Sequence, residues 1–244
     1  MEDRVVLRSI ALLAVASVSS LVFSGCTETF SQSFVWYDKG IKLYRANELD
    51  DAAGAFRRAT QQNPRNYQAF FMLGEVYAAQ GLNVKALRAY SAALDVLPTT
   101  REGRRDEAFR QQAIERYAQY IASIPSRDIE IASLETRAAE RNTSTDWLLL
   151  ARTLVASGDA DGAIDAYNKA LLAGPEDIAL RRSFGLYLAS LGQTRRASPY
   201  LRDAYTDNPR DAEVIEALRA AGIAVNSAPL ASPARDATVG LERR

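Results

Sequence analysis

Closely spaced carboxylates are the residues of this chain whose type and spacing could support general acid–base chemistry. Asp50 and Asp51 are adjacent, and Asp159 and Asp161 are two residues apart. Both pairs stand at predicted turns, where an aspartate accepts hydrogen bonds from the unpaired N–H groups at the start of a helix. A glycosidase needs two carboxyl groups that converge in one cleft, and the spacing indicates no such convergence. We therefore interpret these carboxylates as helix starts.

The residue types that the sequence lacks exclude several classes of enzyme. The 244 residues include no histidine and a single cysteine, Cys26. Ser-His-Asp triads and histidine-ligated zinc sites are therefore excluded, and one cysteine cannot form an intrachain disulfide. The sequence also has no glycine-rich phosphate-binding loop. We predict a protein with no catalytic residues, no metal site and no cofactor; an enzyme that uses only carboxylates and lysine is the remote alternative.

The charge balance of the chain argues against a nucleic-acid partner. The sequence has 30 acidic and 30 basic side chains, and its formal net charge is zero. A nucleic-acid-binding domain usually carries a basic patch or an excess of basic residues. We interpret the arginine-rich segment 101–105 and the pair Arg195 and Arg196 as solvated helix ends.

A pattern of large and small residues occurs four times in the chain with a period of 34 residues, starting near Ser33, Tyr67, Ser144 and Ile178. In the second occurrence the pattern reads Phe70, Leu73, Gly74, Tyr77, Gly81, Ala86, Tyr90, Ala93 and Pro98. A fixed period of this length is typical of solenoids, in which each repeat is stabilised by stacking on its neighbours.

Each repeat is predicted to be a helical hairpin. The spacings of three, four and seven residues between its large and small residues are those of one helix face. The fifteenth position of each repeat is Asn47, Gly81, Gly158 or Gly192, and these residue types tolerate a left-handed backbone at a helix end. The closing proline cannot continue a helix. Small residues at fixed positions should let the two helices approach closely.

The four repeats resemble the tetratricopeptide repeat (TPR) family, through Gly74, Ala86, Ala93 and Pro98 and their counterparts. The resemblance implies an all-α fold, a right-handed superhelical solenoid of antiparallel helix pairs that binds proteins. Its regular repeats would be 33–66, 67–100, 144–177 and 178–211. The sequence departs from the family pattern at Lys39 and Arg181, which occupy positions that are usually apolar.

The segments between and after the regular repeats have weaker patterns. We interpret 101–143 as a degenerate or augmented repeat, in which 112–125 looks like a second helix. The stretch before it is too polar and short for a regular first helix. One more amphipathic helix should follow, with Ile129, Leu134 and Ala138 facing inward. Within the solenoid at 33–222, a cap helix is predicted at 211–222, and the tail 223–244 is predicted to be disordered.

The first 25 residues read as a signal peptide. Residues 9–23 are uncharged, and Ser24 and Gly25 precede Cys26. This apolar run is shorter than the roughly 20 residues of a membrane-spanning helix. The segment resembles the lipobox of bacterial lipoproteins, which implies lipid (palmitate) on Cys26, a lipidated linker at 26–32, and the outer membrane, facing the periplasm, as the location. An ordinary secretory signal and an uncleaved inner-membrane anchor are the alternatives.

A protein partner would be bound by the first helices of the repeats, which in the TPR family line a concave groove. The family positions that face the groove carry aromatic, aliphatic and charged residues here, and aromatic and arginine side chains often anchor interfaces. The candidate partner-binding residues are Tyr37, Ile41, Tyr44, Arg45, Phe71, Glu75, Arg152 and Arg182. Tyr37, Tyr44 and Phe71, with Arg45, would form the principal patch, because the core should not need these aromatics. The alternative is that the aromatics are structural.

These observations together predict a lipid-anchored scaffold of the bacterial cell envelope. Its partner would be a peptide or helix bound in the groove. Similar TPR lipoproteins act as pilotins for pilus secretins, in Tad pili, or as adaptors for cell-wall hydrolases. The alternative is a secreted or inner-membrane-anchored interaction protein without lipid.

Overall fold

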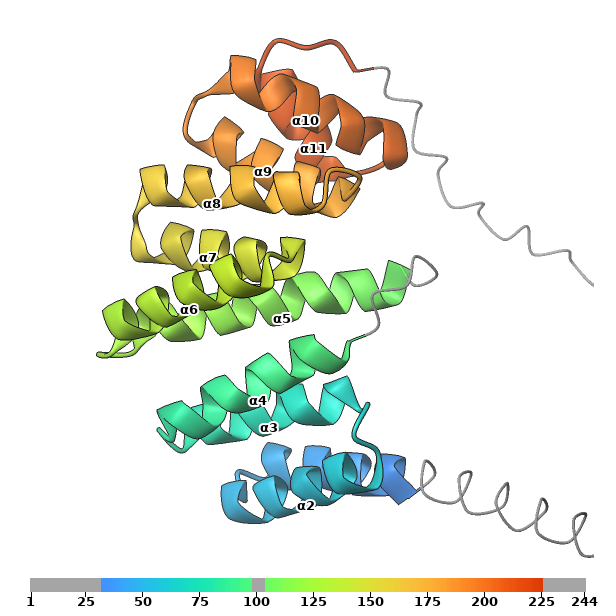
Figure 1. The fold of residues 1–244 in the computed structure, drawn as a ribbon. Coiled ribbons are helices and arrows are strands. Elements are labelled where there is room, and N and C mark those ends of the chain that lie inside the picture. The colour runs from blue at the N-terminus through green and yellow to red at the C-terminus, as the bar shows by residue number, and fades with distance from the viewer. Residues whose placement is uncertain (1–31, 98–103, 226–244) are drawn as a thin grey trace, which may run out of the picture. The chain divides into compact units, whose positions relative to one another are not determined.

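The structure is a computed structural model of the 244-residue chain, and it describes residues 32–97 and 104–225. All regular secondary structure in these ranges is helical, which confirms the predicted all-α fold class (Figure 1). The expected signal peptide at 1–25, Cys26 and residues 226–244 of the expected tail lie outside the described residues.

The chain divides into two compact units, the first ending at Ala166 and the second beginning at Tyr167. The first unit contains a helix over residues 32–45, followed by α2 (Leu49–Gln62), α3 (Tyr67–Ala79), α4 (Asn83–Val96), α5 (Arg104–Ser123), α6 (Arg127–Arg141) and α7 (Ser144–Ser157). Helix α8 (Ala160–Ala173) spans the division. The second unit continues with α9 (Ile178–Ser190), α10 (Thr194–Asp207) and α11 (Ala212–Ala220).

Neighbouring helices form antiparallel hairpins, as the repeat pattern predicts. α3 packs closely on α4 in the first unit, and α9 packs closely on α10 in the second (Figure 1). The residues at the fifteenth repeat position have positive φ angles: 62° at Asn47, 70° at Gly81, 84° at Gly158 and 73° at Gly192. This confirms the predicted left-handed turn between the two helices of each hairpin.

The small residues of the pattern are in contact with large residues on the paired helix. A Cβ atom added to Gly74 of α3 would lie 2.6 Å from a ring carbon of Tyr90 on α4. A Cβ atom added to Gly40 would lie equally close to the ring of Phe56 on α2. Both aromatic rings are fully buried. The predicted close approach of paired helices is therefore confirmed, and it is achieved by a glycine on one helix facing a ring on the other.

Residues 104–143, called the irregular segment below, belong to the part of the chain predicted to be a degenerate or augmented repeat. They differ from that expectation at two points. Residues 104–123 form one helix of 20 residues, so the stretch expected to be too polar for a regular helix is its beginning. The buried residues Ala113, Ile114, Tyr117 and Ile121 give α5 an apolar stripe, and the helix packs chiefly against α7. That stripe stabilises the helix, and its first turns can remain polar because packing rather than local composition decides.

Helix α6 follows its predicted orientation only in part. Leu134 and Ala138 are buried as expected, whereas Ile129 is 73% exposed and the expectation that it faces inward is wrong. A helix turns by about 100° per residue. Around the helix axis, Ile129 therefore lies about 140° from Leu134 and about 180° from Ala138, on the opposite side of α6.

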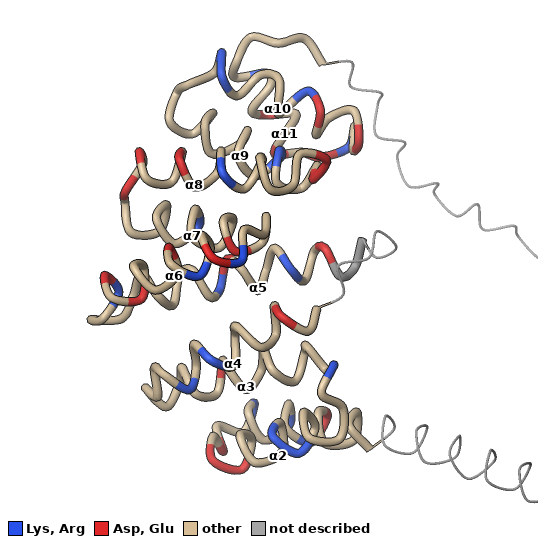
Figure 2. Tube along the Cα trace, in the orientation of Figure 1, with Lys and Arg blue, Asp and Glu red and all other residues tan. Residues whose placement is uncertain are grey.

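A buried aspartate joins α4, α6 and α7 in the first unit. Asp146 at the start of α7 has Arg137 Nε 3.1 Å from its Oδ1 and Arg141 Nε 3.2 Å from its Oδ2. The same two arginines reach α4, where Arg137 donates a hydrogen bond to Ser91 and Arg141 donates one to Asp95. Basic and acidic residues accordingly lie close together on α6 and α7 (Figure 2). This polar cluster takes part in holding the irregular helix α6 in place.

In the second unit, Arg181 stands at a repeat position that is usually apolar. Arg181 of α9 donates a hydrogen bond of 2.6 Å to Asp203 of α10 and another to the carbonyl oxygen of Pro175. Arg181 therefore fits a position that is usually apolar because its charge is paired between helices.

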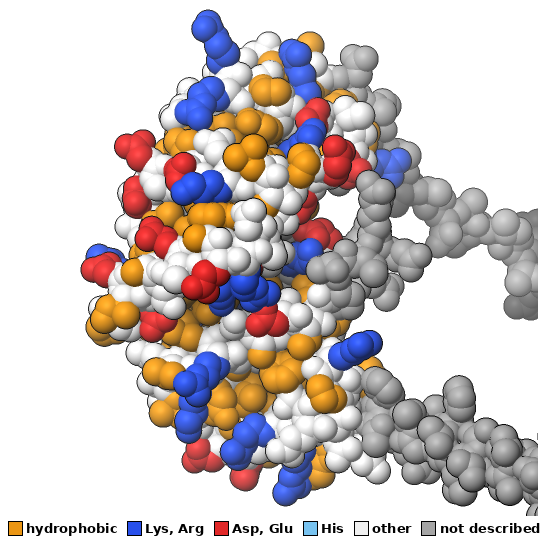
Figure 3. Space-filling model, viewed as in Figure 1, with side chains coloured by type: hydrophobic (Ala, Val, Ile, Leu, Met, Phe, Trp, Pro, Cys, Tyr) orange, Lys and Arg blue, Asp and Glu red, His pale blue; other side chains and the backbone are white. Residues whose placement is uncertain are grey.

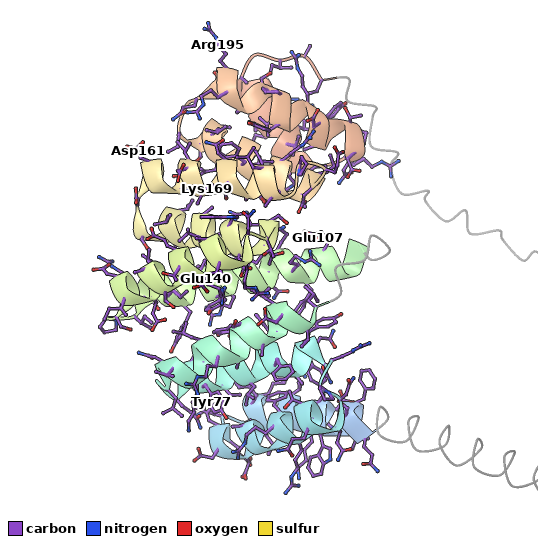
Figure 4. The ribbon with its side chains drawn as sticks, in the orientation of Figure 1. Tyr77, Glu107, Glu140, Asp161, Lys169 and Arg195 are labelled. Carbon is purple, nitrogen blue, oxygen red and sulfur yellow. The ribbon has the colours of Figure 1, made fainter. Side chains whose placement is uncertain are left out.

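At the start of α10, Arg195 and Arg196 are exposed, and Arg195 extends away from the helix (Figure 4).

Candidate functional site

The candidate binding site is a pocket of 310 Å³ in the first unit. Four of its lining residues come from helix 32–45 and α3, namely Tyr44, Phe71, Met72 and Glu75, and four come from α5, namely Gln112, Glu115, Arg116 and Gln119. The pocket thus lies between the first helix of a regular repeat and the helix that opens the irregular segment.

Aromatic packing forms the apolar side of the pocket. The ring of Phe71 meets Phe109 of α5 edge to face, with ring centroids 5.3 Å apart, and lies 5.7 Å from the ring of Tyr90. Tyr67, one turn earlier on α3, also contacts Phe109, at 4.8 Å. Aromatic pairs at such distances stabilise beyond the area that they bury. This cluster holds α3 against α5 and fixes the apolar wall of the pocket.

A three-residue polar contact forms the other side. Arg116 donates two hydrogen bonds to Glu75, from Nε to Oε1 at 2.7 Å and from Nη2 to Oε2 at 3.0 Å. The hydroxyl of Tyr90 donates to the same Oε1 at 2.6 Å. Burial and the hydrogen bond to Glu75 raise the pKa of Tyr90 well above its ordinary value, so its phenol stays protonated as a donor. Bidentate pairs of this kind are geometrically specific.

The remaining charges at the pocket are paired as well. Glu115 lies 3.5 Å from Nη1 of Arg152 on α7 and accepts a hydrogen bond of 2.8 Å from Gln119. The hydrogen bond from Arg116 to Glu75 also raises the pKa of the Arg116 guanidinium, which stays charged. Two carboxylates and two guanidinium groups therefore neutralise one another around the pocket.

The structure brings three of the sequence-predicted residues together at the pocket: Tyr44, Phe71 and Glu75. Arg152 lies beside them through its pairing with Glu115. Tyr37 and Ile41 are half-buried and pack against the core of α2 and α3, where the ring centroid of Tyr37 lies 5.8 Å from that of Phe56. Arg45 is exposed on the same helix and does not line the pocket.

The expectation that the core does not need Phe71 is wrong. Its side chain is only 7% exposed, between Tyr90 and Phe109. The expectation failed because Phe109 belongs to the irregular segment, and no pattern in the sequence indicates that this segment contacts α3. Phe71 therefore forms part of the wall of the pocket and also part of the core.

Arg182 lies in the second unit, where its guanidinium is bound within the chain. Its Nε and Nη2 contact the two carboxylate oxygens of Asp211 at 2.6 and 3.2 Å, and Nη2 also contacts Glu213 at 2.7 Å. The hydrogen bond from Arg182 is the main reason that the pKa of Asp211 is lowered. Asp211 in turn accepts from the backbone N–H of Val214 at the start of α11. Arg182 thus attaches α11 to α9.

The four pocket residues on α5 are not among the candidates predicted from the sequence. Gln112, Glu115, Arg116 and Gln119 follow the spacing of three, four and seven residues that marks one helix face. If this segment had been predicted to be the first helix of a repeat, the spacing would have placed all four residues on the face toward α3.

The first unit has a second hollow, of 300 Å³, beside the helix 32–45. Its lining includes Trp36, Lys39, Asp51 and Arg58, and the guanidinium carbon of Arg58 lies 4.4 Å from the ring centroid of Trp36. The face of the molecule seen in Figure 3 mixes hydrophobic and charged side chains.

Residues 32–97 and 104–225 contain neither a candidate membrane span nor a candidate metal site. Within these ranges no helix is both long and apolar enough to cross a membrane. No group of three or more His, Cys, Asp or Glu side chains in the described part could hold a metal ion.

Two segments of the chain match the tetratricopeptide repeat family, residues 37–99 and residues 145–186. These segments are therefore tetratricopeptide repeats, which confirms the resemblance seen in the 34-residue pattern. The curated Cell division cycle protein 27 homolog of Caenorhabditis elegans is 40% identical over 62 residues. That match covers 25% of this chain and 8% of the relative's length.

Several solved structures are similar to this chain. YrrB, described as a TPR protein with an unusual peptide-binding site, is 14% identical with a TM-score of 0.40 over 75% of this chain and 90% of its own. MamA from Desulfovibrio magneticus RS-1 is 14% identical with a TM-score of 0.39, over 74% of this chain and 97% of its own. PilW, described as a type IV pilus biogenesis factor, is 17% identical with a TM-score of 0.34, over 76% and 98%.

Proposed function

We propose that this chain, with tetratricopeptide repeats at 37–99 and 145–186, is a protein-binding scaffold of the bacterial cell envelope. A segment of the partner protein, a peptide or a helix, would bind at the pocket between α3 and α5, and lipid on Cys26 would hold the chain at a membrane. The TPR fold is that of a protein–protein interaction scaffold, and no enzymatic family is indicated.

The pocket is the observation that carries the binding proposal. Its volume of 310 Å³ is at the lower end of the range for ligand pockets, roughly 300 Å³ upward, and suits one or two side chains of a partner. Tyr44, Phe71 and Met72 offer an apolar wall, and the exposed amide of Gln112 lies at its edge. An apolar wall with polar groups at its edge is the usual arrangement at a site where a partner side chain inserts.

Membrane attachment is supported by the sequence around Cys26. The uncharged run 9–23 is followed by Ser24, Gly25 and the single cysteine of the chain. Several acyl chains on one residue would hold a protein stably at a bilayer, whereas a single chain binds reversibly. The resemblance to bacterial lipoproteins favours the outer membrane and assistance in assembling a pilus, secretion or cell-wall complex. A secreted or inner-membrane-anchored scaffold without lipid is the alternative.

Filling the pocket is expected to weaken peptide binding without unfolding the protein. Gln112→Trp places a large ring at the exposed edge of the pocket. Peptides selected from a phage-displayed random library on the unlipidated wild-type protein should bind this variant at least about tenfold more weakly, a loss of about 1.4 kcal/mol. Binding of each synthesised peptide is measured by calorimetry.

Gln61→Trp is the matched control, because Gln61 is an exposed glutamine of α2 that does not line the pocket. It should leave both binding and thermal stability unchanged. If the selected peptides bind Gln112→Trp and the wild type equally well, the pocket is not the binding site.

The membrane proposal predicts that Cys26 carries acyl mass in the mature protein. Cys26→Ser should shift the chain from the membrane fraction to the soluble periplasm or to an uncleaved precursor, because no thiol remains to be lipidated. Intact-mass spectrometry of the wild-type N-terminus is the direct measurement. A mature wild-type chain that begins elsewhere, or whose Cys26 has no added mass, would favour the secreted or inner-membrane alternative.

A further inference from the structure

The charged residues of the pocket between α3 and α5 are arranged as closed pairs. Glu75 accepts two hydrogen bonds from Arg116 and a third from Tyr90, and its side chain is only 13% exposed. Glu115 is occupied by Arg152 and Gln119. Each carboxylate that lines the pocket therefore already has a partner inside the chain.

We infer that the pocket selects an uncharged, apolar side chain of the partner, such as leucine, methionine or phenylalanine, and that Arg116 sets this selectivity by masking Glu75. The inference rests on the proposed function, because it concerns the occupant of the same pocket. A charged side chain would lose its hydration while finding no free opposite charge. An apolar side chain would instead gain contact with Tyr44, Phe71 and Met72.

Replacement of Arg116 should change which side chain the pocket accepts, because Glu75 is held in place independently of Arg116. Glu75 belongs to α3 and is additionally held by the buried Tyr90. The carboxylate should therefore remain at the pocket when the arginine is removed. Arg116 lines the pocket, and its side chain is 48% exposed, so its replacement leaves no cavity in the core. Loss of the guanidinium would then present an unpaired carboxylate to the partner.

An unmasked Glu75 would change the class of partner that the pocket accepts. A lysine or arginine side chain could take the place of the Arg116 guanidinium and form a charge-assisted hydrogen bond with the carboxylate. Pairs between exposed charges weaken with salt. The variant should thus bind basic peptides in a salt-dependent way, whereas the wild type should bind apolar peptides with little dependence on salt.

Parallel selections on the unlipidated wild type and on Arg116→Met test this inference. The same random peptide library is used for both proteins, and peptides are then synthesised with leucine, lysine or glutamate at the position that the selected sequences share. For the wild type, the leucine peptide should bind at least about tenfold more tightly than the lysine or glutamate peptide, a difference of about 1.4 kcal/mol. For Arg116→Met, the lysine peptide should gain about tenfold in affinity, and this gain should decrease at high salt.

Arg127→Met is the matched control, because Arg127 is a half-exposed arginine of α6 whose ion pair is with its sequence neighbour Asp128. It should keep the wild-type preference. Arg116→Gln is measured alongside and should also shift toward lysine, since it removes the charge with a smaller change of polarity.

The outcomes separate the inference from the proposed function. Selected peptides with a charged residue at the shared position, or an unchanged preference in both Arg116 variants, would overturn the inference and leave the binding function intact. A library that yields no binding peptide would overturn both.

Discussion

Replacing Phe71 by alanine is expected to destabilise the first unit by about 3–5 kcal/mol, the usual cost of truncating a buried aromatic residue. Phe71 is 7% exposed and packs against Phe109 and Tyr90. Its removal leaves a cavity where α3 meets α5, and the loss of the aromatic contacts adds to the cost. Chemical denaturation monitored by circular dichroism would measure the change in the free energy of unfolding.

Phe34→Ala provides the matched comparison, because the substitution is the same and Phe34 is 56% exposed. It should change the free energy of unfolding by no more than about 0.5 kcal/mol, as is typical of surface substitutions. If Phe71→Ala were as mild as Phe34→Ala, the packing of α5 on α3 would be wrong. Destabilisation of the protein would also weaken peptide binding. The stability measurement is therefore needed before weaker binding by Phe71→Ala is attributed to a lost contact with the partner.

Replacing Asp146 by alanine is expected to cost about 3 kcal/mol. Breaking a buried ion pair by removing one partner typically costs about 3–5 kcal/mol, because the opposite charge is left unpaired. The lower figure applies here because Asp146 is buried but Arg141 is 45% exposed and partly screened by water. The variant also loses the hydrogen bond of 2.6 Å that Thr143 donates to the carboxylate. Denaturant unfolding of the full chain measures the loss.

Two further variants test whether the charge of Asp146 or its packing accounts for the stability that Asp146→Ala loses. Asp95→Ala removes a carboxylate that is 43% exposed, pairs with Arg141 and accepts a long hydrogen bond from Ser91, so it should cost less than about 1 kcal/mol. Asp146→Asn keeps the size of the side chain and one acceptor oxygen but removes the charge. If this variant were as stable as the wild type, packing and not charge would account for the role of Asp146.

The repeats could be predicted from the sequence because their determinants are local and periodic. A glycine or asparagine at the fifteenth position gives the left-handed turn, as at Asn47 and Gly81. A glycine on one helix faces a ring on the next at a fixed distance along the chain, as Gly74 faces Tyr90. Both effects act between residues close in sequence, so the pattern itself indicates them.

The pocket could be predicted only in part for the opposite reason. Tyr44, Phe71 and Glu75 follow from the repeat register, but the other wall comes from α5, whose segment has no such register. That Arg116 reaches Glu75, or that Phe109 covers Phe71, depends on which helix lies beside α3. No spacing along the chain encodes that neighbour.

The sequence by itself determined the turns, the helix pairs and the small residues where paired helices touch, because each of these is set by steric limits within one repeat. Only the tertiary structure decided which charges are masked and which aromatics are buried. Arg182 is an example, since its pairing with Asp211 and Glu213 attaches α11 and removes an apparently available cation. Burial and charge pairing are properties of neighbouring surfaces, and those surfaces meet only when the helices are packed.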